Sequence, residues 1–172
     1  MIFEPLPLPE DELPAVPERE TLEGFFEYFR VVIERKLAGV SLEDASRPMV
    51  PSGTNLLGIV KHLGYVERGW FQMGFAGEPP LPVPWTDEDP DADFRIEPGE
   101  TIEGVIAWYR QQWERSREIS GAAESLDQIE RRTGPRGGHS LRWILIHMIE
   151  ETARHAGHMD ILREQIDGGL GD

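Results

Sequence analysis

Three side chains of the sequence have the chemistry and the spacing of metal ligands: His62, Glu151 and His155. Glu151 and His155 are four residues apart, so on a helix they lie on one face and can reach a single ion. Two imidazoles and one carboxylate match several catalytic zinc sites and also the facial triad of non-haem iron enzymes. Because three protein ligands leave a coordination position for water or substrate, the set is typical of catalytic rather than structural sites.

The segment that carries Glu151 and His155 is predicted to be one long helix, with Ser140 as its N-cap and Gly168 as its stop. Apolar side chains recur along it at steps of three and four residues, as in a helix that faces a core. These residues are Leu141, Ile144, Leu145, Met148, Ala156, Met159, Leu162 and Ile166. Glu151 and His155 continue the apolar stripe, so we expect them to point inward, where ionisable groups are costly unless paired or metal-bound. A Glu-x-x-x-His pair alone usually marks a solvated helix face, so the metal hypothesis needs a third ligand.

His62 is the candidate for that third ligand. It lies on a second predicted helix, residues 54–75, on the face that carries the apolar side chains, so its imidazole should point inward. A lone histidine on such a face is ordinarily a core residue bonded to a carbonyl. It becomes a ligand if the fold brings it opposite Glu151 and His155. Asn55, two turns earlier on the same side, is a candidate for the pocket beside the metal.

Two further long helices are predicted, and the four together indicate an all-α four-helix bundle. One covers residues 21–39 with an aromatic stripe, and the other begins at Thr101. A short helix is expected within residues 122–132. Residues 1–20, rich in proline and acid, are expected to form an extended arm, so that a single domain spans residues 21–172.

The chain between residues 76 and 100 is too rich in proline to be a regular helix. Long connections of this kind are often functional, and this one either covers the mouth of a pocket, pinned by Trp85 and Phe94, or is an inert crossover. Its acidic residues lack the central glycine and closing glutamate of a calcium loop, so we interpret them as solvated surface. These residues are Asp87, Glu88, Asp89, Asp91 and Asp93.

The net charge limits the partners of the protein. Acidic residues outnumber basic ones by 32 to 17, giving a net charge of −15 that disfavours nucleic acid and anionic membranes. No segment has the apolar length of a membrane span and no signal peptide is found, so we expect a cytoplasmic protein with a small-molecule substrate.

Because the chain has no cysteine, any reactive sulfur must come from a cosubstrate. A basic cluster, Arg131, Arg132 and Arg136, is either a solvated patch or a site for an anionic substrate.

Three parts of the chain resemble the DinB-like superfamily of four-helix-bundle metalloenzymes: TNLLGIVKHLGYVERGWF at 54–71, LRWILIHMIEETARHAGHMDILREQIDG at 141–168, and the aromatic first helix. The sequence is most similar to a bacterial branch near the mycothiol-dependent maleylpyruvate isomerase and thiol S-transferase type. The resemblance covers residues 21–168. It implies an up-down-down-up order of helices, and it is consistent with a homodimer formed through helix faces.

The resemblance also implies a residue for each metal ligand. In the superfamily, a histidine of the second helix and two residues four apart on the fourth hold the metal, and these correspond to His62, Glu151 and His155. Glutamate rather than histidine at position 151 favours the thiol-transferase side. His158 stands where relatives often have glutamine and is expected to line the pocket, while His147 is expected to pack or to support a ligand. Either histidine is a fallback ligand if Glu151 turns away.

Three functional hypotheses follow. In the first, which we favour, a divalent metal activates a low-molecular-weight thiol, such as mycothiol or bacillithiol, or water, for attack on a small electrophile. The metal expected is Zn²⁺, with Ni²⁺, Mn²⁺ and Fe²⁺ as alternatives. In the second, the protein binds metal without turnover and supplies a fourth ligand in a closed pocket. In the third, the bundle is purely structural and its histidines satisfy one another.

Overall fold

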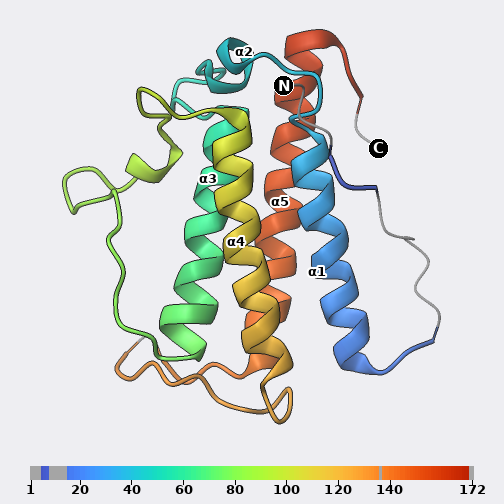
Figure 1. Ribbon diagram of the computed structural model, residues 1–172, viewed down its shortest axis with the longest axis vertical. Coiled ribbons are helices and arrows are strands. Elements are labelled where there is room, and N and C mark those ends of the chain that lie inside the picture. The colour runs from blue at the N-terminus through green and yellow to red at the C-terminus, as the bar shows by residue number, and fades with distance from the viewer. Residues whose placement is uncertain (1–4, 8–14, 136, 171–172) are drawn as a thin grey trace.

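The computed structural model describes residues 5–7, 15–135 and 137–170. Its elements are α1 (Glu18–Arg35), α2 (Leu42–Ser46), α3 (Leu56–Glu67), the π-helix η1 (Arg68–Phe75), the 3-10 helix η2 (Ala92–Phe94), α4 (Ile102–Gly121) and α5 (Leu141–Asp167). The long helices α1, α3, α4 and α5 lie side by side, with α1 and α5 running in one direction and α3 and α4 in the other (Figure 1). No β-strand occurs in the described ranges, so the predicted all-α class is confirmed. None of the described helices is long and apolar enough to cross a membrane.

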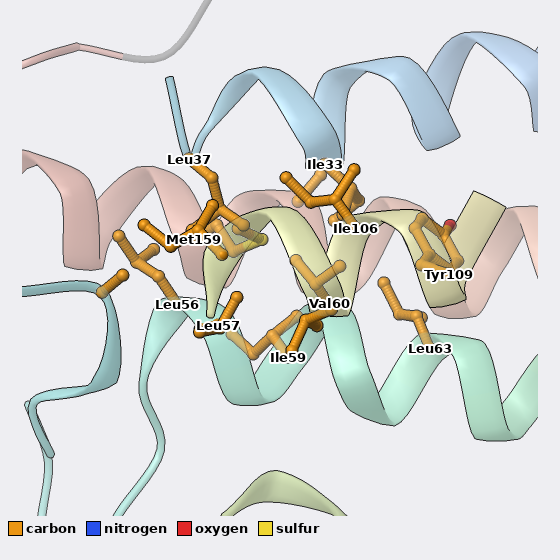
Figure 2. Close-up of a cluster of buried hydrophobic side chains, with 14 of the residues drawn as sticks. Ile33, Leu37, Leu56, Leu57, Ile59, Val60, Leu63, Ile106, Tyr109 and Met159 are labelled. Atoms are coloured by element: carbon orange, nitrogen blue, oxygen red, sulfur yellow. The ribbon is translucent and has the colours of Figure 1, made fainter. Parts of the chain in front are cut away.

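All four long helices contribute to one apolar core (Figure 2). Ile33 from α1, Leu63 from α3, Ile106 from α4 and Met159 from α5 are each at most 2% exposed. Removing such side chains from water, at about 25 cal/mol per Å² of apolar surface, is the main stabilising contribution to the fold. Because α5 packs against both α1 and α3, this core also fixes the separation of α3 and α5. These are the two helices that carry the candidate ligands.

Helix caps place the starts of α3, α4 and α5 where the sequence predicts them to within two residues. The side chains of Asn55, Thr101 and Ser140 each accept a hydrogen bond from the backbone N–H three residues later. At the other end of α5, Gly168 is left-handed with a φ of 76°, as expected of a glycine that stops a helix. The register of both ligand-bearing helices is therefore set by local capping chemistry.

The bounds of the first helix differ from the prediction. α1 begins at Glu18 rather than Thr21. Pro17 precedes the helix with a φ of −54°, which suits a helix start, and the N–H that proline lacks would have no helical partner at this position. The helix ends at Arg35, four residues before the predicted glycine stop at Gly39, and single turns complete the remaining stretch.

Residues 122–132 do not form the predicted short helix. The backbone N–H groups of Arg131 and Arg132 instead donate to the carbonyls of Phe75 and Gly74, at 3.1 and 3.0 Å. These bonds to the end of η1 take the place of helical hydrogen bonds. The segment therefore runs beside η1 and brings Arg132 within reach of Trp70, with its guanidinium carbon 5.1 Å from the ring centre.

The second predicted helix is formed by α3 and η1 in direct succession. From Arg68 onward the hydrogen bonding widens to the π-helical pattern, which changes the direction in which successive side chains point. Such π-helical turns are rare in proteins and are frequently found at functional sites.

The connection from η1 to α4 runs back along α3 (Figure 1) and packs against it through η2. Gly58 of α3 faces the backbone carbonyl of Phe94, and a Cβ atom at position 58 would lie 2.1 Å from that oxygen. Glycine at this position therefore allows the close approach of η2 to α3.

We expect Gly58→Ala to destabilise the protein by about 1–3 kcal/mol, because the added methyl group collides with backbone rather than with a movable side chain. The matched control is Gly157→Ala on α5, where a Cβ would meet nothing within 4 Å. That change should stabilise by up to about 1 kcal/mol through the better helix propensity of alanine. Thermal unfolding followed by circular dichroism measures both, and equal midpoints for the two variants would contradict the expectation.

Candidate metal centre

The structure brings together the three residues that the sequence indicates as ligands. His62 of α3 and Glu151 and His155 of α5 each offer a ligand atom within 4.8 Å of the other two. Nε2 of His62 lies 3.5 Å from Oε1 of Glu151, and Nε2 of His155 lies 3.3 Å from the same oxygen. Ligand atoms held at 2.0–2.2 Å from one tetrahedral ion are separated by roughly 3.3–3.6 Å. Two of the three pairs of ligand atoms therefore have the spacing expected around a single small cation, and the third pair lies within 4.8 Å.

The three candidate ligands lie in the interface between α3 and α5. His155 is 8% exposed, and the side chains of Glu151 and His62 are 13% and 18% exposed. Nδ1 of His155 is buried and has no hydrogen-bond partner among the described residues. This nitrogen is not the candidate ligand atom, and the second nitrogen of a metal-bound imidazole is normally bonded as well. Nε2 of both rings faces one oxygen of Glu151, which favours a set of ligands over histidines that satisfy one another.

Asp93 holds the imidazole of His62 in its orientation. Oδ2 of this buried carboxylate lies 2.7 Å from Nδ1 of His62, while the ring of Phe94 stacks on the imidazole at 4.2 Å. With Nδ1 occupied, Nε2 is directed at Glu151, an arrangement that recurs around metal-bound histidines. The interpretation of Asp93 as solvated surface was wrong. The signal that distinguishes it from its acidic neighbours is the aromatic residue that follows it.

Arg154 orients the carboxylate of Glu151 in a similar way. One guanidinium nitrogen lies 2.6 Å from Oε2 of Glu151, so that Oε1 is left to face the two imidazoles. Arg154 also forms an ion pair with Glu150 on the exposed side of α5. Sequence reasoning did not identify this role, although a spacing of three residues on a helix is compatible with it.

The electrostatics of the centre favour a cation. Hydrogen bonds with His155 and His62 lower the pKa of Glu151 far below its usual range, so this carboxylate is anionic at neutral pH. Burial alone would lower the pKa of His62, but its bonds with Asp93 and Glu151 outweigh burial and raise it. The centre without metal therefore attracts a proton onto an imidazole, and a metal ion would take the place of that positive charge.

The other predicted site residues lie outside this group of ligands. His158 is exposed and contacts His155 edge to face, with ring centres 5.3 Å apart. His147 packs between Trp70 and Trp143, in agreement with the expected packing role. The side chain of Asn55 is engaged in capping α3, where it accepts a hydrogen bond of 2.8 Å.

A pocket of about 790 Å³ opens beside the centre, and His62 is the ligand that faces it. Asp93 and Phe94 form the wall next to His62, and the segment 76–100 supplies the outer wall. Trp85 of that segment packs edge-on against Tyr65 of α3, with ring centres 5.4 Å apart. The segment therefore covers a pocket and is pinned by its aromatic residues, rather than being an inert crossover.

Of the basic cluster singled out in the sequence, Arg132 alone among the described members lines this pocket. Arg131 is exposed, and Arg136 lies outside the described residues. Arg132 is partly neutralised by the buried Glu130, with Nε 3.5 Å from Oε2 of the carboxylate, and it donates to the carbonyl of Gly69 at 2.7 Å.

An all-α bundle with two imidazoles and a carboxylate converging beside a pocket defines a class of candidate metal-dependent helical-bundle proteins. The family model of the mycothiol-S-transferases matches residues 21–168, and the chain belongs to this DinB-like family. A crystal structure of a conserved protein from Enterococcus faecalis is similar in fold, with a TM-score of 0.62 and 12% sequence identity. The match covers 90% of this chain and 100% of that chain. No curated protein matches the sequence.

We expect Asp93→Asn to weaken metal binding by about 10–100-fold while leaving the fold intact, because the amide keeps the shape but removes the negative charge behind His62. Competition with a chromogenic chelator measures the affinity. Asp87→Asn is the matched control, since Asp87 is an exposed carboxylate of the same segment. Equal affinities of the two variants would show that Asp93 does not support the ligand.

Proposed function

We propose that the protein is a metal-dependent transferase that uses a low-molecular-weight thiol to attack a small electrophile. The observation that carries the proposal is the convergence of His62, Glu151 and His155 on one point beside a pocket. Membership of the mycothiol-S-transferase family supports mycothiol as the thiol. A cytoplasmic setting, where small thiols are kept reduced, is part of the proposal.

Zn²⁺ is the metal we propose, since a ligand set of two imidazoles and one carboxylate also occurs in catalytic zinc sites. Ni²⁺, Mn²⁺ and Fe²⁺ accept the same ligand types, so the proposal for zinc rests on this precedent. When bound, the ion would lower the pKa of a coordinated thiol or water so that the anion is present at neutral pH.

The residues of the chain would then have distinct tasks. Asp93 and Arg154 hold His62 and Glu151 in place, so that little reorganisation accompanies binding. The pocket wall of Trp85 and its neighbours limits the access of water to the reacting groups. Since the protein has no cysteine, it cannot itself provide the sulfur nucleophile, and the thiol must enter through the pocket.

The non-catalytic alternative requires a fourth protein ligand and a closed pocket. Within the described part of the chain, the group of candidate ligands has three members, and a pocket adjoins it. Both observations favour an open coordination position over a filled one, and so favour turnover over sequestration.

We expect His155→Ala to abolish binding of a single metal ion per chain, because the variant retains two of three ligands. His147→Ala is the matched control on the same helix, since His147 packs against tryptophans away from the ligands. Elemental analysis of untagged protein, together with circular dichroism, gives the result. Equal metal content in both variants would remove the basis of the proposed site, and unfolding of His155→Ala without a change in metal content would support the structural hypothesis.

We further expect the zinc-loaded protein to accelerate the reaction of mycothiol with a model electrophile such as a chlorodinitrobenzene. A chelator or His155→Ala should reduce the rate to that without protein, whereas His147→Ala should keep it. Absorbance of the thioether product measures the rate. If the protein binds metal but shows no thiol-dependent turnover of any electrophile in a panel, the proposed enzymatic activity is contradicted. The hypothesis of a metal-binding module without turnover then remains.

A further inference from the structure

Arg68, the first residue of η1, is a buried cation in the wall of the pocket beside the metal centre. It is 9% exposed, and its guanidinium donates a hydrogen bond to the carbonyl of Pro82 and lies over the ring of Tyr65, 4.8 Å from its centre. No carboxylate among the described residues forms an ion pair with it. Burial lowers the pKa of Arg68, which reflects a positive charge without a compensating anion.

Other arginines in comparable positions are compensated. Arg30 is buried at 3% exposure and forms a two-point ion pair with Glu67, through bonds of 2.9 and 2.5 Å. Arg132, on the same pocket as Arg68, faces the carboxylate of Glu130 at 3.5 Å. A chain with a net charge of −15 has ample carboxylates to pair with a buried arginine. An uncompensated buried guanidinium is costly, so its position in a pocket calls for an external anion.

The rest of the pocket indicates what kind of anion fits. Most of the pocket wall is apolar or aromatic: Tyr65, Trp70, Met73, Val83, Trp85 and Phe94. Its other charged residues are Arg132, Asp91 and Asp93, and Asp93 is bonded to His62. Guanidinium groups bind carboxylates and phosphates through two parallel hydrogen bonds. Arg68 follows His62 by six residues, which is roughly 9 Å along the helix axis. One small molecule can therefore reach both residues across a pocket of about 790 Å³.

We infer that Arg68 is the anion-binding residue of this pocket and that it receives the carboxylate or phosphate of a small organic molecule whose apolar body lies against the aromatic wall. The placing of the reactive end of this molecule beside His62 rests on the proposed function. The binding of the anion itself does not require metal. The expected anion site is therefore Arg68, to which the sequence assigns no role, rather than the cluster of Arg131, Arg132 and Arg136.

The competing explanation is that Arg68 serves only to anchor the segment 76–100 through Pro82. Three probes with the same naphthalene body separate the two roles: 2-naphthoate, 2-naphthyl phosphate and the neutral 2-naphthamide. Their dissociation constants are measured by ligand-observed NMR. We expect at least one anion to bind about tenfold or more tighter than the amide, as for hydrogen bonds to a charged group. The anion that binds more tightly shows whether the site prefers a carboxylate or a phosphate group. Equal affinity for all three probes overturns the inference.

Substitution then tests the residue. Arg68→Gln should weaken the preferred anion by about tenfold or more and change the affinity for 2-naphthamide little. Arg131→Gln, an exposed arginine outside the pocket lining, is the matched control and should bind all probes as the parent does. Unchanged anion binding by Arg68→Gln, or an equal loss for anion and amide, assigns Arg68 to anchoring and overturns the inference.

A second variant keeps the test decisive if Arg68→Gln does not fold. Gly69 lines the pocket, and a Cβ at this position would meet nothing within 4 Å. Gly69→Leu leaves Arg68 and its bond to Pro82 in place while narrowing the pocket, so it should weaken binding of all three probes. Unchanged affinity of this variant for all three probes would mean that they bind outside this pocket, and it would overturn the inference.

The same measurements on metal-free protein separate this inference from the proposed function. If the anion binds through Arg68 in the presence of a chelator but no zinc binds to untreated protein, the proposed function fails and the anion site stands. If zinc binds and thiol turnover occurs, but the protein binds the anionic and neutral probes with equal affinity, the anion site fails and the proposed function stands.

Discussion

The site depends on one interaction: a single carboxylate oxygen of Glu151 faces the imidazoles of His62 and His155 across the interface of α3 and α5. Neither helix alone can form this arrangement, because α5 supplies two of the groups and α3 the third. The distance between the helices is set by the apolar core, in which Leu63 and Met159 are fully buried. Packing to native density leaves little freedom to change that distance. The cost of burying the polar cluster is thus offset by the same core that holds its members together.

The segment 76–100 matters to this interaction as much as the helices do. It has almost no regular secondary structure, yet it reaches α3 through Asp93, which bonds to His62, and through Trp85, which packs on Tyr65. The bond from Arg68 to Pro82 is a further attachment. Gly58 lets the backbone of Phe94, the neighbour of Asp93, approach α3 closely. The orientation of His62, a candidate metal ligand, and the shape of the pocket are therefore determined by the same few contacts. A change in the orientation is thus expected to alter the pocket, and the reverse.

Periodicity and capping residues were sufficient to predict the all-α class, the span of α5 and the inward direction of Glu151 and His155, because these depend on neighbours within one helix. The contribution of His62 required the additional assumption that two distant segments meet. Asp93 and Arg68 were missed because their roles depend on which residues pack opposite them, and composition alone marks them as surface charge. The short helix expected within 122–132 does not form for a related reason, since backbone groups of this segment bond to η1 and to residues 139–142 instead. Local patterns therefore identify candidate ligands better than they identify the groups that orient them.

The charges around the pocket assign different tasks to the metal and to Arg68. Glu151, Asp93 and Glu150 carry three negative charges, and Arg154 balances one of them, so that two remain to balance a divalent ion at the proposed site. Arg132 is balanced in turn by Glu130. Among the described residues of the pocket, Arg68 then remains as a buried charge without an ion-pair partner, beside aromatic walls that lower the effective dielectric constant. Recognition of an anionic group would therefore fall to Arg68, while the metal centre, close to neutral overall, would be free to act on the reacting atom.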